Sequence, residues 1–236
     1  MSIRLGFVEG PGGSAAVEAE LAGYLSRLVR WDKAAVVRLR SAEGEPVLGV
    51  FGHPPFGGVL AVKSMALRAA GIGGAVDATV SAGDLLEAVA ATVDGGEFTV
   101  PPSVTGPAWA GLLPPRGGWR RVTELEPAAV RALAARVVAE FRARTEALVP
   151  ERRTREELDA LAEELWQRPL PGGATGVTLR VVHAAHALGF LPTGDADEAE
   201  PVAVLAAGPW LRLRTGYGSV AVRGASAATG LTVSPA

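Results

Sequence analysis

The 236-residue chain contains no cysteine, only two lysines and only three histidines. The absence of cysteine excludes disulfides, thiol catalysis and zinc sites built on thiolates. Schiff-base lysine chemistry is restricted to Lys33 and Lys63. A cysteine-free chain fits a reducing compartment, and we expect a cytoplasmic protein.

Long apolar runs and a strong charge balance are also missing. The N-terminus lacks the charged and apolar regions of a signal peptide, and no stretch of about 18 uncharged apolar residues indicates a membrane span. The longest candidate, 177–191, is interrupted by Arg180, His183 and His186. The formal net charge of −2 gives no reason to expect nucleic acid or an anionic membrane. We therefore expect a soluble protein with neither partner.

Motifs of cofactor and nucleophile chemistry are absent as well. The chain has no Gly-Lys-Ser/Thr ending of a P-loop, no Gly-x-Gly-x-x-Gly of a Rossmann fold and no Gly-x-Ser-x-Gly of a serine hydrolase. The sequence predicts no cofactor. Alanine, glycine and valine are abundant and the basic residues are almost all arginine, which resembles the usage of high-GC bacteria.

The N-terminal half reads as a helix and an antiparallel meander. Apolar residues at helical spacing predict a helix over 14–29. Short β-branched runs joined by turn-forming residues predict strands; they lie at 3–8, 35–40, 46–51, 59–65 and 76–80. Ser81 and Asp84 have capping-box spacing before a helix over 85–93. The prolines of 100–119 predict an extended connector.

The C-terminal half is mostly helical before it returns to strands. The pattern predicts three helices, over 127–148, from the Thr154 capping box to before Pro169, and over 177–190. Strands are predicted at 202–205, 210–215 and 219–223. Arg38–Arg40 and Arg212–Arg214 alternate with leucine in the same way, which an exposed arginine face explains without an internal repeat.

These elements predict an α+β fold: an antiparallel β-meander with flanking helices, a helical C-terminal segment and a closing β-hairpin. The terminal strands are expected to return to the first sheet, which makes residues 1–236 a single domain. The alternative is an antiparallel sheet lobe over 1–120 and a helical lobe with the closing hairpin over 121–236.

The sharpest local pattern is His183 and His186, which lie three residues apart on one helical face. Neutral imidazoles are common metal ligands, so this pair is a candidate metal site. The glutamate and the four-residue spacing of zinc-protease helices are missing. A third ligand would have to come from the acidic stretch 195–200 or from elsewhere, and the alternative is two half-buried histidines with backbone partners.

A second candidate region combines prolines, tryptophans and arginine. Rigid, weakly polar surface suits a ligand groove or a protein contact. The alternative is that the connector wraps the sheet and its tryptophans complete the core. The candidate ligand- or partner-binding residues are His53, Phe56, Trp109, Trp119 and Arg120.

Two functions follow from these observations. The first is a non-catalytic binding or accessory protein that uses the Pro/Trp surface or a sheet face for a protein partner or an apolar small molecule. Separately, a homodimer is a candidate on base rates for a bacterial protein of this size. The second is an enzyme with a dispersed site, in which His53 or His183 works with a carboxylate. The sequence identifies neither a substrate nor a reaction.

Overall fold

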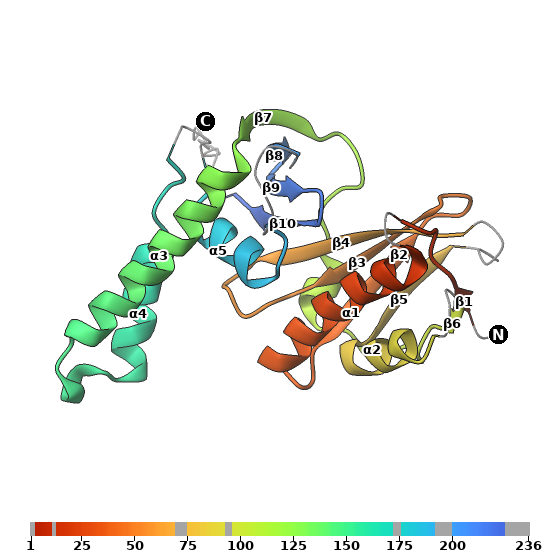
Figure 1. Cartoon of the computed structure of the whole chain (residues 1–236), viewed down its shortest axis with the longest axis horizontal. Coiled ribbons are helices and arrows are strands. Elements are labelled where there is room, and N and C mark those ends of the chain that lie inside the picture. The colour runs from red at the N-terminus through yellow and green to blue at the C-terminus, as the bar shows by residue number, and fades with distance from the viewer. Residues whose placement is uncertain are drawn as a thin grey trace, which may run out of the picture.

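The main sheet has eight antiparallel strands in the order β5-β2-β3-β4-β10-β9-β8-β7 (Figure 1). The computed structural model describes residues 3–10, 13–68, 75–92, 96–171, 176–191 and 200–224. The strands of this sheet are β2 (Val36–Ser41), β3 (Val47–Gly52), β4 (Leu60–Ala66), β5 (Val76–Ser81), β7 (Arg120–Leu125), β8 (Val202–Ala207), β9 (Trp210–Thr215) and β10 (Gly218–Arg223). The predicted α+β class is confirmed.

The helices within these residues agree closely with the helical spacing of the sequence. They are α1 (Gly13–Trp31), α2 (Ala82–Ala90), α3 (Pro127–Ala147), α4 (Arg155–Trp166) and α5 (Leu179–Ala187), with two 3-10 turns, η2 (Ala108–Gly111) and η3 (Pro150–Arg152). Ser81 caps α2 by accepting from the amide of Asp84, and Thr154 caps α4 by accepting from the amide of Glu157. Both caps satisfy amides that have no partner inside the helix.

The strand predictions need two corrections. The segment 3–8 forms only β1 (Arg4–Leu5), which pairs with the equally short β6 (Phe98–Thr99) apart from the main sheet. The edge strand β7 was not predicted, because its arginines, threonine and glutamate lack the apolar alternation of a strand that faces a core. The predicted return of the terminal strands is confirmed, since β10 pairs with β4.

The two faces of the sheet differ in character because side chains alternate along each strand. On one face lie leucines such as Leu39 and Leu213, both fully buried. Helices α1 and α2 pack over the β2–β5 half, α5 packs against β9 and β10, and α3 and α4 pack against α5. The opposite face carries the alternating arginines of β2 and β9.

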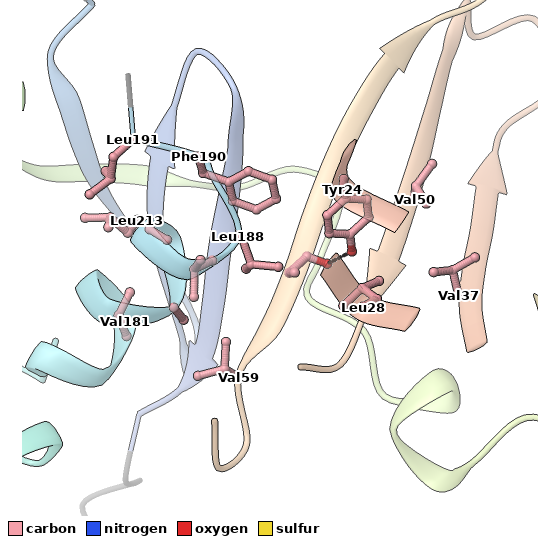
Figure 2. Close-up of a cluster of buried hydrophobic side chains, with 14 of the residues drawn as sticks. Tyr24, Leu28, Val37, Val50, Val59, Val181, Leu188, Phe190, Leu191 and Leu213 are labelled. Carbon is pink, nitrogen blue, oxygen red and sulfur yellow. Dashed lines mark hydrogen bonds between the residues drawn. The ribbon is translucent and has the colours of Figure 1, made fainter. Parts of the chain in front are cut away.

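The helix-covered core continues across the junction of β4 and β10. Tyr24 from α1 and Phe190, which follows α5, pack against each other with tilted rings whose centroids are 5.6 Å apart (Figure 2). The Tyr24 hydroxyl donates to the carbonyl of Ala61 on β4, and burial raises the pKa of Tyr24. Glycine at position 52 allows α1 to approach, since a Cβ there would lie 2.5 Å from the Tyr24 hydroxyl oxygen. The prediction of a single domain is consistent with this shared core and stays a prediction.

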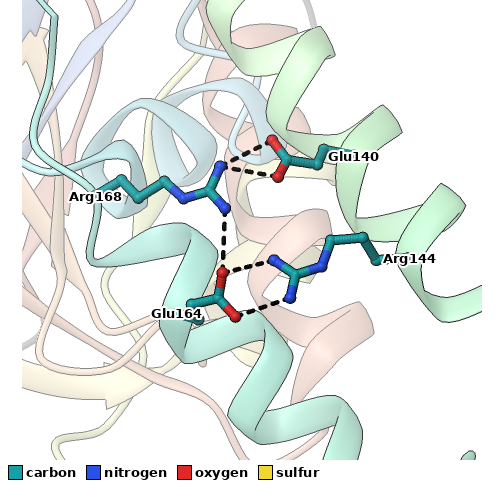
Figure 3. Close-up of polar contacts among 4 residues, drawn as sticks. All are labelled: Glu140, Arg144, Glu164 and Arg168. Atoms are coloured by element: carbon teal, nitrogen blue, oxygen red, sulfur yellow. Dashed lines mark hydrogen bonds and ion pairs between the residues drawn. The ribbon is translucent and has the colours of Figure 1, made fainter.

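Helices α3 and α4 form a hairpin that is held by charged side chains on its surface (Figure 3). Arg168 donates to both carboxylate oxygens of Glu140, at 2.8 and 2.9 Å, and to Glu164 at 3.2 Å. Arg144 makes a bidentate pair with Glu164 at 2.6 and 2.9 Å. Hydrogen bonds first from Arg144 and then from Arg168 lower the pKa of Glu164 to about 2.

The predicted connector crosses the face of the sheet opposite the helices. It joins β6 to β7 and is extended apart from η2. Its backbone contacts the sheet edge through the amide of Val104, which donates to the carbonyl of Thr79 on β5. Trp109, Leu113 and Trp119 pack on a small second cluster of Leu60, Trp210 and Ala221. This arrangement leaves hollows on both sides of the connector.

Candidate binding cleft

A cleft of about 1220 Å³ opens where the connector, the loop before β4, α5 and the start of β9 meet. Trp210 and Leu60, which are 7% and 4% exposed, contribute apolar surface from the sheet. Trp109 and Leu112 line the cleft from the connector, and Thr178 from the start of α5. Segments from both halves of the chain therefore build this cleft.

The loop before β4 is fixed against α5 by Arg180. This guanidinium donates to the carbonyl of Phe56 at 3.1 Å and to Glu163 on α4 at 2.6 Å. Its hydrogen bond is the main cause that lowers the pKa of Glu163. Gly57 has a positive φ of 61°, and a Cβ there would lie 2.3 Å from a nitrogen of Arg180. Glycine is needed at this position for both reasons.

His53 and Trp109 form the side of the cleft that faces solvent. Their rings are stacked, with centroids 5.8 Å apart and an interplanar angle of 18°. Both residues also line a neighbouring hollow of about 480 Å³ with Asp32 and Pro55. His53 is exposed and Trp109 half-buried, so a flat aromatic surface is presented to any molecule that enters.

The candidate residues predicted from the sequence are only partly brought together. Phe56 turns inward and packs edge-on against His183 and Trp31, at 5.1 Å from each ring. Trp119 lies at a separate hollow on the same face of the sheet. Arg120 is exposed on β7 and lines none of the hollows described here.

The His183 and His186 pair is divided between the interior and the surface. His183 lies edge-on between Phe56 and Trp166, whose ring centroids are 5.1 and 4.9 Å away, whereas His186 is exposed. Burial, and secondarily His186, lowers the pKa of His183 to about 4. Within the described ranges no three metal-ligating side chains gather, and 192–199 of the acidic stretch lie outside those ranges. The metal site stays a prediction.

Lys63, one of the two lysines open to Schiff-base chemistry, has structural contacts instead. Lys63 is 5% exposed; its ammonium pairs with Glu20 at 2.6 Å and donates to the carbonyl of Tyr217 at 2.8 Å. This ties the β9–β10 turn to α1. In the part of the chain that the structure describes, no carboxylate hydrogen-bonds or ion-pairs with an imidazole. The geometry gives the catalytic hypothesis no support.

The sequence analysis missed Trp210 and Arg180, which contribute to the cleft from β9 and α5. The alternation of Trp210 with Arg212 and Arg214 does place these three on one sheet face. What it could not show is that the loop 53–58 and the connector lie beside that face. In the sequence, Arg180 appears only as an interruption of the apolar run 177–191.

Two protein-family models match the chain, and both describe domains of unknown function. One (DUF8010) matches residues 13–111 and the other (DUF8185) matches residues 114–227. The first region runs from α1 to η2, the second from β7 to β10, so the two correspond to the two halves of the sheet. No curated protein sequence matches.

The fold is similar to that of Caulobacter crescentus pol III beta, with a TM-score of 0.50 and 12% identity over 95% of this chain and 66% of that one. The DNA polymerase sliding clamp from Pseudomonas aeruginosa matches with a TM-score of 0.49 and 13% identity, over 89% of this chain and 63% of that one. The chain thus spans less than two thirds of the length of these structures. No described helix is both long and apolar enough to cross a membrane.

Proposed function

We propose that this chain is a non-catalytic binding protein that holds an extended apolar segment of a partner protein in the cleft of His53, Trp109 and Trp210. The observation that carries this proposal is the cleft itself. Its volume of about 1220 Å³ exceeds the roughly 300–1,000 Å³ of small-molecule sites. A segment of polypeptide fits such a space better than a single small molecule.

The chemistry of the walls supports the same occupant. Trp109 and Trp210 offer large apolar area with few rotatable bonds, which is typical of residues that dominate protein interfaces. The loop that carries His53 is fixed by Arg180, so little order must be gained on binding. Arg223 is exposed at the rim and suits an acidic residue of the partner.

The proposal does not include nucleic acid as the partner. The likeness to pol III beta shows the fold alone, and the charge of the helices does not favour a phosphate backbone. Helices α1 to α5 together carry eleven acidic and eight basic residues, although α3 by itself has four arginines against two glutamates. Absence of a gel shift with duplex DNA at low salt would agree with this, and a salt-sensitive shift would contradict it.

Peptide selection on the immobilised protein tests the proposal. We expect a random-peptide library to yield apolar sequences, and we expect Trp109→Ala to weaken their binding about tenfold or more. Fluorescence anisotropy of a labelled selected peptide measures the affinity. Trp119→Ala is the matched control, because this half-buried tryptophan packs on the same cluster but does not line the cleft.

Equal loss of affinity in both variants would show that the tryptophans act through stability, and would overturn the proposal. So would a library that yields no peptide sensitive to Trp109→Ala. A compact apolar dye that binds at the cleft while no peptide does would assign the site to a small molecule instead.

A further inference from the structure

Arg212 on β9 is a half-buried cation with no anion beside it among the residues that the structure describes. Its Nε donates to the hydroxyl of Ser219 at 2.7 Å, and its guanidinium lies 5.5 Å from the centre of the Trp119 ring. No carboxylate among the described residues forms an ion pair with Arg212 or with its neighbour Arg214. Both arginines therefore keep donors that the described part of the chain leaves unused.

On the same sheet face, the two arginines of β2 do have a carboxylate partner. Arg38 also donates to a hydroxyl, that of Thr79, at 2.9 Å. There, however, Asp77 on β5 lies 2.6 Å from Arg38 and 3.6 Å from Arg40. The corresponding carboxylate is missing beside β9, where the strands that flank Arg212 and Arg214 place Leu205, Ala203, Ala221 and Ser219 opposite them.

The space beside Arg212 is large enough for a ligand. A hollow of about 550 Å³ is lined by Arg212, Arg214, Trp119 and Ser219 together with the β9–β10 turn. Arg116 also lines it, although Glu45 lies 3.7 Å from this guanidinium. Among the described residues that line the hollow, Glu200 is the one acidic residue, so the balance of their charge is positive.

We propose that this hollow binds the oxyanion of a small ligand, a phosphate monoester or a carboxylate, through Arg212 and Arg214. The guanidinium of Arg212 lies over the Trp119 ring, and its Nε is already bonded to Ser219. Its Nη groups therefore present fixed donors, which match the paired oxygens of a phosphate or carboxylate. The site is separate from the cleft of the proposed function, whose lining does not include Arg212 or Trp119.

The electrostatics of the hollow agree with this assignment. Burial, and secondarily the charge of Arg214, lowers the pKa of Arg212. An arginine stays protonated in proteins, so it bears this unfavourable environment as a cation. An oxyanion placed between Arg212 and Arg214 would stabilise the charged guanidinium and so offset both effects.

Calorimetric titration with inorganic phosphate and, separately, with citrate tests the proposal. We expect saturable binding of at least one of them above an equal-ionic-strength chloride control, and the stronger of the two identifies the class of oxyanion. Arg212→Gln should weaken this binding about tenfold or more. Arg38→Gln is the matched control and should leave it unchanged, because Arg38 lies on the same face beside its own carboxylate.

Glu200→Gln removes the acidic residue of the hollow and should strengthen binding. Failure of both oxyanions to bind the native protein and Glu200→Gln would overturn the proposal, as would equal weakening by Arg38→Gln. Binding that emerges only after Asp195, Asp197 and Glu198 are neutralised would assign the anion to the chain itself, and would also overturn it. Trp109→Ala, which tests the cleft proposal, leaves this hollow intact because Trp109 does not line it. Failure of the cleft proposal can therefore be distinguished from failure of the oxyanion proposal.

Discussion

The two halves of the eight-stranded sheet carry the same strand pattern and differ in how its charges are neutralised. In β2 and in β9 a buried leucine stands between two arginines that point to the opposite face. Asp77 on the neighbouring strand neutralises the first pair, whereas no described carboxylate neutralises the second. Identical local patterns therefore fix which face a side chain takes, while its partner depends on the neighbouring strand.

The largest expected effect is a loss of stability when Leu39 or Leu213 is truncated, because both leucines belong to the same helix-covered core. Leu39→Ala and Leu213→Ala each remove a side chain that is 0% exposed, and each should lower the free energy of unfolding by about 2–5 kcal/mol. If the halves form one cooperative unit, urea denaturation followed by circular dichroism shows one transition in both variants. Two separated transitions, with only one shifted by each substitution, would favour two lobes.

The second effect is confined to the C-terminal half and depends on pH. The pKa of His183 is lowered to about 4 by burial, against 6.5 for the ordinary side chain. Between pH 6.5 and 4 the unfolded chain binds more protons than the folded one, so the free energy of unfolding falls as pH falls. The total is on the order of 3 kcal/mol, since each pKa unit corresponds to about 1.4 kcal/mol.

Urea denaturation at pH 6.5 and pH 5 measures this effect. His183→Leu should flatten the dependence in that window, and His186→Gln, at an exposed position, should leave it as in the native protein. An equal slope in the native protein and in His183→Leu would contradict the burial of a neutral imidazole.

The third prediction concerns a variant in which the arginines of β2 lack a carboxylate partner, as those of β9 do among the described residues. Asp77→Asn removes the carboxylate from Arg38 and Arg40, and because Asp77 is half exposed the cost should be about 1 kcal/mol or less. Phosphate should then raise the melting temperature of Asp77→Asn more than that of the native protein. No difference between the two responses would mean that unpaired arginines on this face do not attract oxyanions.

The smallest effect is expected at the α3–α4 hairpin. Hydrogen bonds from Arg144 and Arg168 lower the pKa of Glu164 from 4.5 to about 2, so its stabilising contribution is present above pH 4.5 and lost as pH falls toward 2. Glu164→Gln should lower the melting temperature slightly at neutral pH, and the difference from the native protein should vanish near pH 2. High salt should shrink the difference too, because these side chains are exposed.

Much of the secondary structure followed from the sequence because periodicity and capping are local. Ser81 and Thr154 cap their helices as expected, and the meander of β2, β3 and β4 forms with short turns. Strand β7 was not predicted, because an exposed strand at the edge of the sheet does not require apolar alternation. The repeated arginine pattern marks one sheet face in both halves, with β2 and β9 at different places in the strand order.

The candidate site could be predicted only in part. His53 and Trp109 were identified and lie stacked in one cleft, while Phe56 and Trp119 lie elsewhere. Their positions depend on which segments meet across the β4–β10 ladder. That ladder joins residues more than 150 positions apart, as in the pairing of Val62 with Ser219. No spacing within the sequence encodes such a contact.

The sequence by itself determined the α+β class, most helices and strands, and the face of the sheet that each arginine and leucine takes, because these depend on neighbours within a few residues. Only the tertiary structure decided that one histidine is half-buried while the next is exposed, that a tryptophan of β9 completes the cleft, and that Asp77 reaches one arginine pair and not the other. These outcomes depend on burial and on partners from distant segments. Such segments become neighbours only when the strands pair and pack on a common core.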